Sequence, residues 1–445
     1  MPSSDGADVG LLAPLWAGTA VVPVTGDAAI VAAMLEVEIA LARVQAPTAA
    51  ADAIEKVLRE ASVDPGQLAI AARGGGNPVI PLLAELRPML DADSATWLHR
   101  GATSQDVVDS ALVLVARDAT RLVLADADAV IGSLAGLAEA HVETLMTGRT
   151  LTQSAIPTTF GLKAAGWLTG VVAATRQLRA AAGALPVQLG GAAGTLASFT
   201  TLHDDAQPIV DGLAEQLGLV TPVAPWHVQR HPITSLGDGL AALSDGLGVI
   251  AANVSLLARA EIGELAEPSR EGGGGSSAMP HKQNPVLSTL ISSGALRAPS
   301  LAADLHRAAV TVDERPPGAW HSEWQVLREL LRTVGGQAET ARELVGGLVV
   351  NADRMRQNLD RVGDVVISER VMLELGPVIG KGAVQDAVDH AARSSQGLRD
   401  ILRAIPELAD WSDQRLADLT DPAQYTGAAA VIIARAVADS RKDTN

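Results

Sequence analysis

A glycine-rich stretch that ends in a lysine and an asparagine holds residues well suited to chemistry in this 445-residue chain. Residues 272–285 read GGGGSSAMPHKQNP. Four glycines leave backbone N–H groups free to gather an anion, and Lys282 and Asn284 add a positive charge and an amide. The pattern predicts an anion-binding loop, although a flexible linker before a helix that starts at Pro285 would contain the same glycines.

A second polar segment stands directly before a long apolar periodic stretch. Residues 99–109 read HRGATSQDVVD. If a helix begins here, the side chains of Thr103, Ser104 and Gln105 and the free N–H groups of the first turn can seat a carboxylate. An ordinary helix cap followed by acidic residues would give the same pattern, so local chemistry leaves both interpretations open.

The histidines offer one candidate for acid–base chemistry and no metal site. His99 opens the second segment, and an unperturbed imidazole titrates near the working pH of most enzymes. His227 and His231 are spaced as zinc ligands on a helix would be, but prolines flank them and no third ligand is evident. We therefore predict no bound metal.

The elements that position these segments are predicted to be helices. Only 2% of the residues are aromatic while 48% are hydrophobic, which favours tightly packed Ala and Leu helices over sheets. Apolar residues recur at three- and four-residue spacing in several long stretches. The predicted helices cover residues 30–44, 105–145, 159–182, 236–266, 285–312 with a kink at Pro299, and 322–359.

This pattern predicts an all-α protein of three helical domains. Residues 1–105 form an N-terminal domain, residues 106–350 a central bundle of long helices, and residues 351–445 a small C-terminal domain. The central helices carry apolar residues on more than one face, so they need neighbours on more than one side. We expect several subunits to share one bundle.

Charge and composition exclude several classes of protein. The formal net charge of −17 excludes nucleic acid as a partner, because binding to a phosphate backbone needs a basic surface. The apolar stretch of residues 9–26 lacks a preceding Lys or Arg and is broken by prolines, unlike a signal peptide. The charge-free span 180–203 is broken by glycines, unlike a membrane helix. We expect a cytoplasmic protein that binds no membrane.

Residues 275–285 resemble the signature loop of the fumarase/aspartase superfamily, Gly-Ser-Ser-x-Met-Pro-x-Lys-x-Asn-Pro, at every fixed position. The resemblance implies that Ser276 moves a proton at the carbon beside a substrate carboxylate and that Lys282 and Asn284 bind that carboxylate. Residues 99–109 resemble the superfamily's first conserved region. With His99 as a second candidate for proton donor, the residues expected to bind substrate are Thr103, Ser104, Gln105, Arg149, Thr150, Gln153, Ser277, Met279, His281, Asn284 and His321.

One position departs from most of the superfamily. Residues 148–161, GRTLTQSAIPTTFG, resemble a region that usually reads Arg-Thr-His, and here the histidine is Leu151. A leucine can neither donate nor accept a proton. This puts the usual fumarate-releasing activities in doubt, that of adenylosuccinate lyase included.

A branch of the superfamily that tolerates this loss is the bacterial 3-carboxy-cis,cis-muconate cycloisomerases of protocatechuate breakdown. Residues 189–197, LGGAAGTLA, and residues 318–324, GAWHSEW, are similar to that branch. The resemblance implies closure of a lactone ring on a small tricarboxylate, without a cofactor, in a homotetramer whose sites are shared between subunits. The alternatives are adenylosuccinate lyase or a related fumarate-releasing lyase, and a non-catalytic helical oligomer.

Substitution of Ser276 by alanine tests the implied proton transfer. We expect Ser276→Ala to lose most of its turnover, because no other hydroxyl would stand at that place in the loop. Steady-state kinetics on the purified variant gives the answer. A variant that keeps most of its turnover would remove Ser276 from the mechanism.

Overall fold

Helices account for nearly all of the regular structure of this Ala- and Leu-rich chain. The computed structural model describes residues 9–269, 279, 282–394 and 396–443. Within them the all-α prediction is confirmed, and the strands form two short antiparallel pairs, β1 with β2 and β3 with β4. Ser276, Ser277 and His281 lie outside the described residues.

The long helices span most of the middle of the chain, and shorter helices precede and follow them. The α-helices and strands are α1 Val21–Val24, α2 Asp27–Gln45, α3 Thr48–Glu60, α4 Pro65–Gly75, α5 Val79–Leu86, α6 Ala92–Ala95, α7 Ser104–Ala140, β1 Leu145–Thr150, β2 Gln153–Thr159, α8 Phe160–Gly183, α9 Ala197–Leu202, α10 Gln207–Leu217, α11 His231–Leu257, β3 Leu265–Ala266, α12 Val286–Ala308, α13 Ala319–Gly346, β4 Val349–Val350, α14 Ala352–Val362, α15 Ser368–Ile379, α16 Lys381–Arg393, α17 Leu398–Arg403, α18 Asp413–Thr420 and α19 Ala429–Ser440.

Most of the helices predicted from apolar spacing are confirmed with shifted ends, but two are wrong in extent. The stretch 236–266 is helical only to Leu257, and Leu265 and Ala266 form strand β3. The stretch 322–359 is not one helix, because α13 ends at Gly346 and α14 begins after the short strand β4. Gly347 packs so closely on Pro268 that an added β-carbon would lie 2.6 Å from the proline Cβ. The chain beyond it pairs with β3, so the helix cannot continue.

The chain divides into two compact units, each built from several stretches of sequence. Unit 1 comprises residues 1–127, 174–248 and 290–340, and unit 2 comprises residues 128–173, 249–289 and 341–445. The three domains predicted from the sequence follow different boundaries, and that division stays a prediction.

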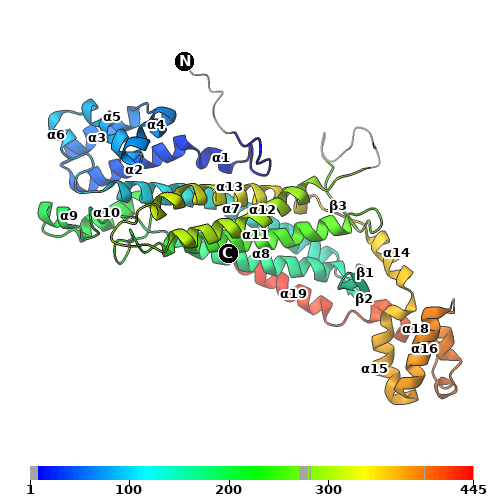
Figure 1. Ribbon diagram of the computed structural model, residues 1–445. Coiled ribbons are helices and arrows are strands. Elements are labelled where there is room, and N and C mark those ends of the chain that lie inside the picture. The colour runs from blue at the N-terminus through cyan, green and yellow to red at the C-terminus, as the bar shows by residue number, and fades with distance from the viewer. Residues whose placement is uncertain (1–8, 270–278, 280–281, 395, 444–445) are drawn as a thin grey trace. The chain divides into compact units, whose positions relative to one another are not determined.

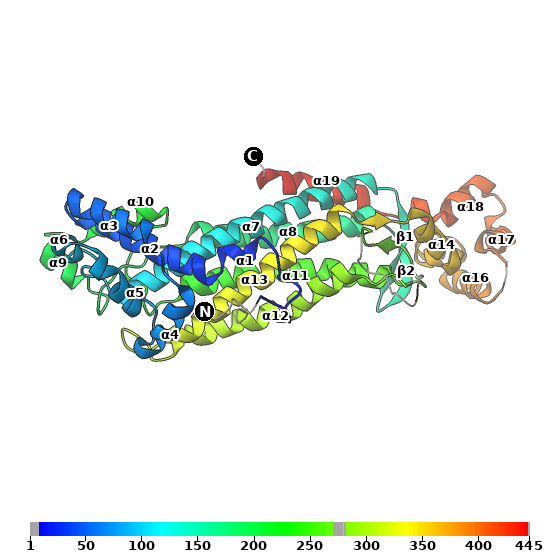
Figure 2. The same cartoon turned by 90° about the horizontal axis from the view of Figure 1, so that it is seen from above.

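In unit 1 the start of α7 is enclosed on every side. Residues 105–116 of this helix are all buried. The parts of α7, α11, α12 and α13 in this unit lie side by side (Figure 1), and the blue helices α2, α3 and α6 lie near α10 (Figure 2). An α-helix that is apolar all round requires such enclosure. The polar side chains in its first turns must therefore find partners within the protein.

Helix α11 is the most apolar of the long helices. By length and composition alone it could cross a membrane, and 44% of its most apolar window is buried. Its residues Leu236, Leu240, Leu243 and Leu247 are fully buried in unit 1. This spacing of buried leucines is that of a core helix.

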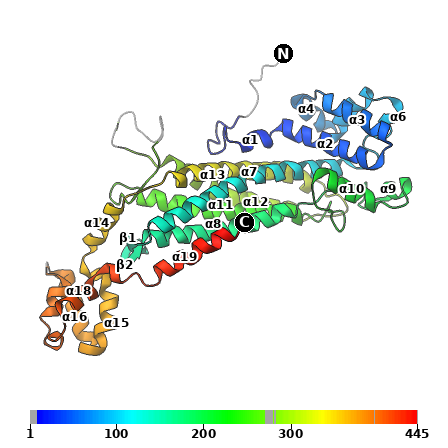
Figure 3. The ribbon, with the colours of Figure 1, turned by 180° about the vertical axis from the view of Figure 1, so that it is seen from behind.

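Unit 2 contains a separate apolar core beyond α13. Helices α14 to α18 gather around it, near the β1–β2 hairpin (Figure 3). Its fully buried members include Ile367, Val371, Leu375, Val384 and Leu402. The expectation of helical packing after residue 351 agrees with this cluster.

Candidate functional site

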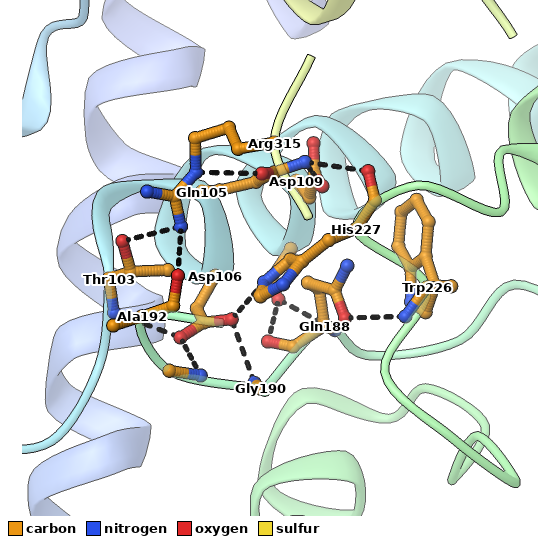
Figure 4. Close-up of polar contacts among 12 residues, drawn as sticks. Thr103, Gln105, Asp106, Asp109, Gln188, Gly190, Ala192, Trp226, His227 and Arg315 are labelled. Carbon is orange, nitrogen blue, oxygen red and sulfur yellow. Dashed lines mark hydrogen bonds and ion pairs between the residues drawn. The ribbon is translucent and has the colours of Figure 1, made fainter. Parts of the chain in front are cut away.

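The start of α7 forms a reciprocal cap around the first polar segment (Figure 4). The backbone N–H of Thr103 donates to Oδ2 of Asp106 at 2.9 Å, and the N–H of Asp106 donates to the carbonyl oxygen of Thr103 at 3.0 Å. A carboxylate in the first turn also interacts favourably with the helix dipole. The helix cap considered from the sequence is therefore present, and it fixes where Thr103 and Ser104 stand.

Asp106 also binds two segments outside α7. Its buried carboxylate accepts the N–H groups of Gly190 at 2.9 Å and Gly191 at 3.0 Å, and lies 2.7 Å from Nε2 of His227. Nδ1 of His227 is buried with no hydrogen-bond partner among the described residues. A β-carbon at Gly190 would lie 2.8 Å from the His227 ring, so glycine is required there. One carboxylate thus joins three segments that are far apart in the sequence.

Arg315 is a cation at this site that sequence reasoning missed. Its guanidinium donates to Oε1 of Gln105 at 3.1 Å, to Oγ1 of Thr103 at 3.0 Å and to the carbonyl oxygen of Ala192 at 3.2 Å. The residue is exposed, so the rest of the guanidinium can face a ligand. No local pattern marked this arginine, because it lies in a loop more than a hundred residues after each of its partners.

Gln105 is fully buried, and both ends of its amide bind protein groups. Its Nε2 donates to the carbonyl oxygen of His227 at 2.9 Å and to Asp109 at 3.2 Å, and its Oε1 accepts a hydrogen bond from Arg315. Contact between Gln105 and a substrate stays a prediction. Beside it, Thr103 and Ser104 are partly exposed and Arg315 is exposed.

A buried ionic cluster supports the next turn of α7. Arg230 binds both oxygens of Asp109, at 2.7 and 3.0 Å, and both oxygens of Glu323, at 2.5 and 3.0 Å. All three side chains are at most 1% exposed. Burial lowers the pKa of Arg230 and the two carboxylates raise it, with a net rise that keeps the guanidinium charged. Burial also leaves the pKa of Glu323 raised despite the neighbouring arginine.

This cluster explains most of the GAWHSEW segment. Trp320 donates its Nε1–H to Asp109 at 2.8 Å, and Glu323 binds Arg230. His321 is exposed and lines a mostly apolar pocket of about 240 Å³ together with Met34, Trp324 and other residues. Trp320 and Glu323 therefore bind other residues inside the protein. Contact of His321 with a substrate stays a prediction.

His99 lies between the N-terminal helices and α7. Its Nδ1 is 2.6 Å from Oε1 of Glu38 on α2, and 14% of its side chain is exposed. Burial lowers the pKa of His99 while the Glu38 carboxylate raises it, and the pKa is raised overall. Glu38 is a second residue that sequence reasoning missed, since it sits among apolar residues on its helix.

In unit 2 the predicted anion-binding residue Arg149 has a protein partner. Two of its nitrogens donate to the carboxylate of Glu264 at 2.6 and 2.9 Å, and Asn358 donates to the same carboxylate at 2.8 Å. Glu264 is fully buried. This network joins β1 to α14, and substrate binding by Arg149 stays a prediction.

The hairpin that carries Leu151 presents it to solvent. Leu151 and Thr152 form the turn between β1 and β2 with positive φ angles of 49° and 69°, and Leu151 is 96% exposed. Thr150 and Gln153 flank the turn and are also exposed. No acid–base group therefore replaces the usual histidine on this turn.

The described part of the signature loop is exposed. Met279, Lys282 and Asn284 all face solvent. Glu267, just before the loop, accepts the N–H groups of Leu287 and Ser288 at 2.9 and 2.7 Å and so caps the start of α12. The residues directly before and after the loop are thereby held together.

The predicted site residues divide between the two units. His99, Thr103, Ser104, Gln105 and His321 belong to unit 1, together with Arg315. Unit 2 holds Arg149, Thr150, Gln153, Met279, Lys282 and Asn284. Among the described residues, no group of three or more His, Cys, Asp or Glu side chains could hold a metal ion.

Comparison with known proteins identifies the family. The family model described as "Lyase" matches residues 19–299, and the model described as "Adenylosuccinate lyase C-terminus" matches residues 364–436. The chain belongs to the fumarase/aspartase superfamily. It is 47% identical to a nitrosuccinate lyase from Streptomyces davaonensis, over 97% of this chain and 94% of that protein.

Two further superfamily members are similar over nearly their whole length. A 3-carboxy-cis,cis-muconate cycloisomerase from Bradyrhizobium diazoefficiens is 38% identical, covering 97% of this chain and 98% of that protein. The crystal structure of the 3-carboxy-cis,cis-muconate lactonizing enzyme from Pseudomonas putida matches with a TM-score of 0.90 at 34% identity, over 98% of this chain and 100% of that chain. The resemblance stated from the sequence is confirmed at the level of the superfamily.

Removal of the buried arginine tests the ionic cluster of this superfamily member. We expect Arg230→Met to lower the free energy of unfolding by about 3–5 kcal/mol, because it leaves Asp109 and Glu323 buried without a cation. A buried carboxyl with a raised pKa favours folding at low pH, so the loss should be smaller at about pH 5 than at about pH 8. Urea unfolding followed by circular dichroism measures both.

The matched control is Arg297→Met on α12. Arg297 pairs with Glu329 at 2.7 Å, but its side chain is 56% exposed, so we expect a change below about 1 kcal/mol with little dependence on pH. Equal losses in the two variants would mean that the buried cluster contributes no more than a surface pair.

Proposed function

We propose that this enzyme transfers a proton at the carbon beside a substrate carboxylate while a bond to a stable anion forms or breaks at the adjacent carbon. The signature loop supports the proton transfer through Ser276, and the start of α7 supports the seating of a carboxylate by Thr103, Ser104 and Arg315. Membership of the superfamily supports the reaction class.

The observation that carries this proposal is the exposed Leu151. An amine or hydroxide needs a proton as it leaves, and a general acid usually supplies it. A carboxylate or a nitrite ion is a weak base that leaves or attacks as the anion. A turn without an acid–base side chain therefore favours a substrate whose leaving or attacking group is a stable anion. It disfavours adenylosuccinate, whose leaving group is an amine.

We propose 3-carboxy-cis,cis-muconate as the substrate. One of its carboxylates forms a C–O bond to a carbon of a C=C bond, the electron pair moves to the carbon beside another carboxylate, and that carbon takes up a proton to give the lactone. No protein nucleophile is needed, so the protein supplies seating for the negative charges, stabilisation of the enolate-like intermediate and the proton. The similarity to two enzymes named for this substrate supports it.

Nitrosuccinate is the second candidate, favoured by the 47% identity to a nitrosuccinate lyase. A base would remove the proton beside one carboxylate, the C–N bond would break, and fumarate and nitrite would form. The GAWHSEW segment does not choose between the two substrates, because Trp320 and Glu323 bind other residues of the protein. Both reactions use the same proton transfer and the same kind of anionic partner.

Three parallel assays separate these reactions. We expect purified enzyme to remove the ultraviolet absorbance of 3-carboxy-cis,cis-muconate rapidly, to release little nitrite from nitrosuccinate and to leave adenylosuccinate unchanged. Release of nitrite without loss of the muconate absorbance would identify nitrosuccinate as the substrate in place of 3-carboxy-cis,cis-muconate. Turnover of adenylosuccinate would contradict the argument from Leu151.

We further propose that each site is completed by several subunits of a homotetramer. The predicted site residues come from segments far apart in the sequence, before and after the long helix α7 and in the signature loop. Long helices with apolar residues on more than one face support association of several copies of the chain. Membership of the superfamily supports such an arrangement.

Mixed oligomers test this arrangement. Ser276→Ala and His99→Asn are each expected to lose most of the activity. When the two variants are co-expressed, part of the activity should return, because some sites combine an intact loop with an intact His99. The matched control pairs Ser276→Ala with Lys282→Ala, both in the same loop, and should regain none. No recovery in the first pair, or an active monomer by light scattering, would refute shared sites.

A further inference from the structure

Glu38 is an isolated carboxylate in a buried place. Its side chain is 0% exposed, Oε1 lies 2.6 Å from Nδ1 of His99, and Oε2 is buried without a hydrogen-bond partner in the described part of the chain. A buried carboxylate normally has all its acceptors used, since an unpaired charge in a protein interior is costly. Glu38 therefore depends on the imidazole of His99 for compensation.

The imidazole in turn is directed by Glu38. The contact takes Nδ1, and the ring keeps some exposure to solvent. With Nδ1 bound to a carboxylate, the second nitrogen, Nε2, is the one available to a ligand. A carboxylate on one ring nitrogen is a common way to fix the orientation and the tautomer of a working histidine.

The backbone around His99 is fixed in an unusual conformation. His99 has a φ angle of 59°, in the left-handed region that few residues other than glycine adopt. The carbonyl groups on both sides are held, that of Leu98 by Arg87 at 3.3 Å and that of Arg100 by Gln45 at 2.9 Å. Strain of this kind persists where the surroundings enforce it, and such places concentrate at functional sites.

We propose that Glu38 is a positioning residue that holds His99 as an imidazolium, whose Nε2–H donates to a carboxylate of the bound substrate. This rests on the proposed function, because it assigns His99 to the seating of an anionic substrate. His99 is four residues before Thr103, so it would add a positive charge beside the seat formed by Thr103, Ser104 and Arg315.

The electrostatic surroundings agree with this charge state. Burial lowers the pKa of His99, the carboxylates of Glu38 and Asp106 raise it, and the Arg87 guanidinium lowers it, leaving it above its ordinary value of 6.5. A histidine with a raised pKa contributes stability that is complete below its ordinary pKa and is lost as the pH rises through the folded value. The pair should therefore stabilise the protein more at acidic than at alkaline pH.

The decisive variant is Glu38→Gln, which keeps a hydrogen-bond acceptor for Nδ1 and removes the charge. Histidine-selective ¹⁵N labelling follows the titration of the nine histidines without any substrate, and His99→Asn identifies the signal of His99. Asparagine tolerates the left-handed backbone, so that variant should fold. We expect the His99 titration midpoint in Glu38→Gln to fall by roughly one unit or more.

His141 is the internal control of this titration. Burial lowers its pKa, it bonds to Thr144, and no carboxylate among the described residues pairs with it, so its midpoint should not change. An unchanged His99 midpoint in folded Glu38→Gln would overturn the proposal. If Glu38→Gln does not fold, Glu38→Asp takes its place, because it retains the charge but moves it away from Nδ1 of His99. We expect a smaller fall of the His99 midpoint in Glu38→Asp. An unchanged midpoint in that variant would count against the proposal.

Kinetics then tests whether Glu38 acts through His99. We expect Glu38→Gln to reduce kcat/KM by roughly tenfold or more, with its alkaline limb moved to lower pH, and His99→Asn to reduce it by roughly 10². The double variant should be no worse than His99→Asn alone, because the charge of Glu38 has no imidazole left to act on. Additive losses would show that Glu38 does not act through His99.

These readouts separate the proposal from the proposed function. The NMR titration needs no substrate, so inactivity of the wild-type enzyme on both candidate substrates would reject those substrates and leave the Glu38–His99 result intact. Conversely, if the wild-type enzyme is active but the His99 midpoint is unchanged in Glu38→Gln, the proposed function stands and the role of Glu38 is rejected.

Discussion

The arrangement of unit 1 depends on two buried carboxylates at the start of α7. Asp106 and Asp109 lie where the helix is enclosed on every side, and a buried charge is tolerated only when it is fully compensated. Asp106 is compensated by backbone N–H groups and His227, and Asp109 by Arg230, Gln105 and Trp320. The partners come from the start of α7 itself and from three other parts of the chain, namely residues 190–191, residues 227–230 and Trp320.

This compensation gives the candidate site its shape. The glycines at residues 190 and 191, the loop that carries His227 and the start of α13 are all held by the same two turns of α7. Thr103 and Ser104 consequently occupy fixed places at the helix end, with Arg315 beside them. Groups held in place before a ligand arrives need little reorganisation to bind it, which favours both affinity and catalysis.

The acidic chain and an anionic substrate are compatible for the same reason. The net charge of −17 is spread over the whole protein, whereas the groups at the site are local cations and helix-end N–H groups. Arg315 is exposed beside Thr103, and His99 has a raised pKa next to Glu38. Two other arginines of the chain, Arg149 and Arg230, pair with buried carboxylates.

The sequence by itself determined the helical class, the approximate ends of α7, α8 and α12, and the superfamily. Apolar spacing follows from the helix repeat, and the signature loop is contiguous, so both can be recognised without a structure. It did not determine where α13 ends, because that depends on the close packing of Gly347 on Pro268.

Only the tertiary structure decided which charged groups are available for chemistry. The sequence predicts a substrate contact for Arg149, which stays a prediction, and it marks neither Glu38 nor Arg315 as a site residue. Arg149 pairs with Glu264, more than a hundred residues away, whereas Glu38 turns toward His99 and Arg315 toward Thr103. The pairing of buried charges depends on distances of a few ångströms between segments remote in sequence, and periodicity and motifs carry no record of those distances.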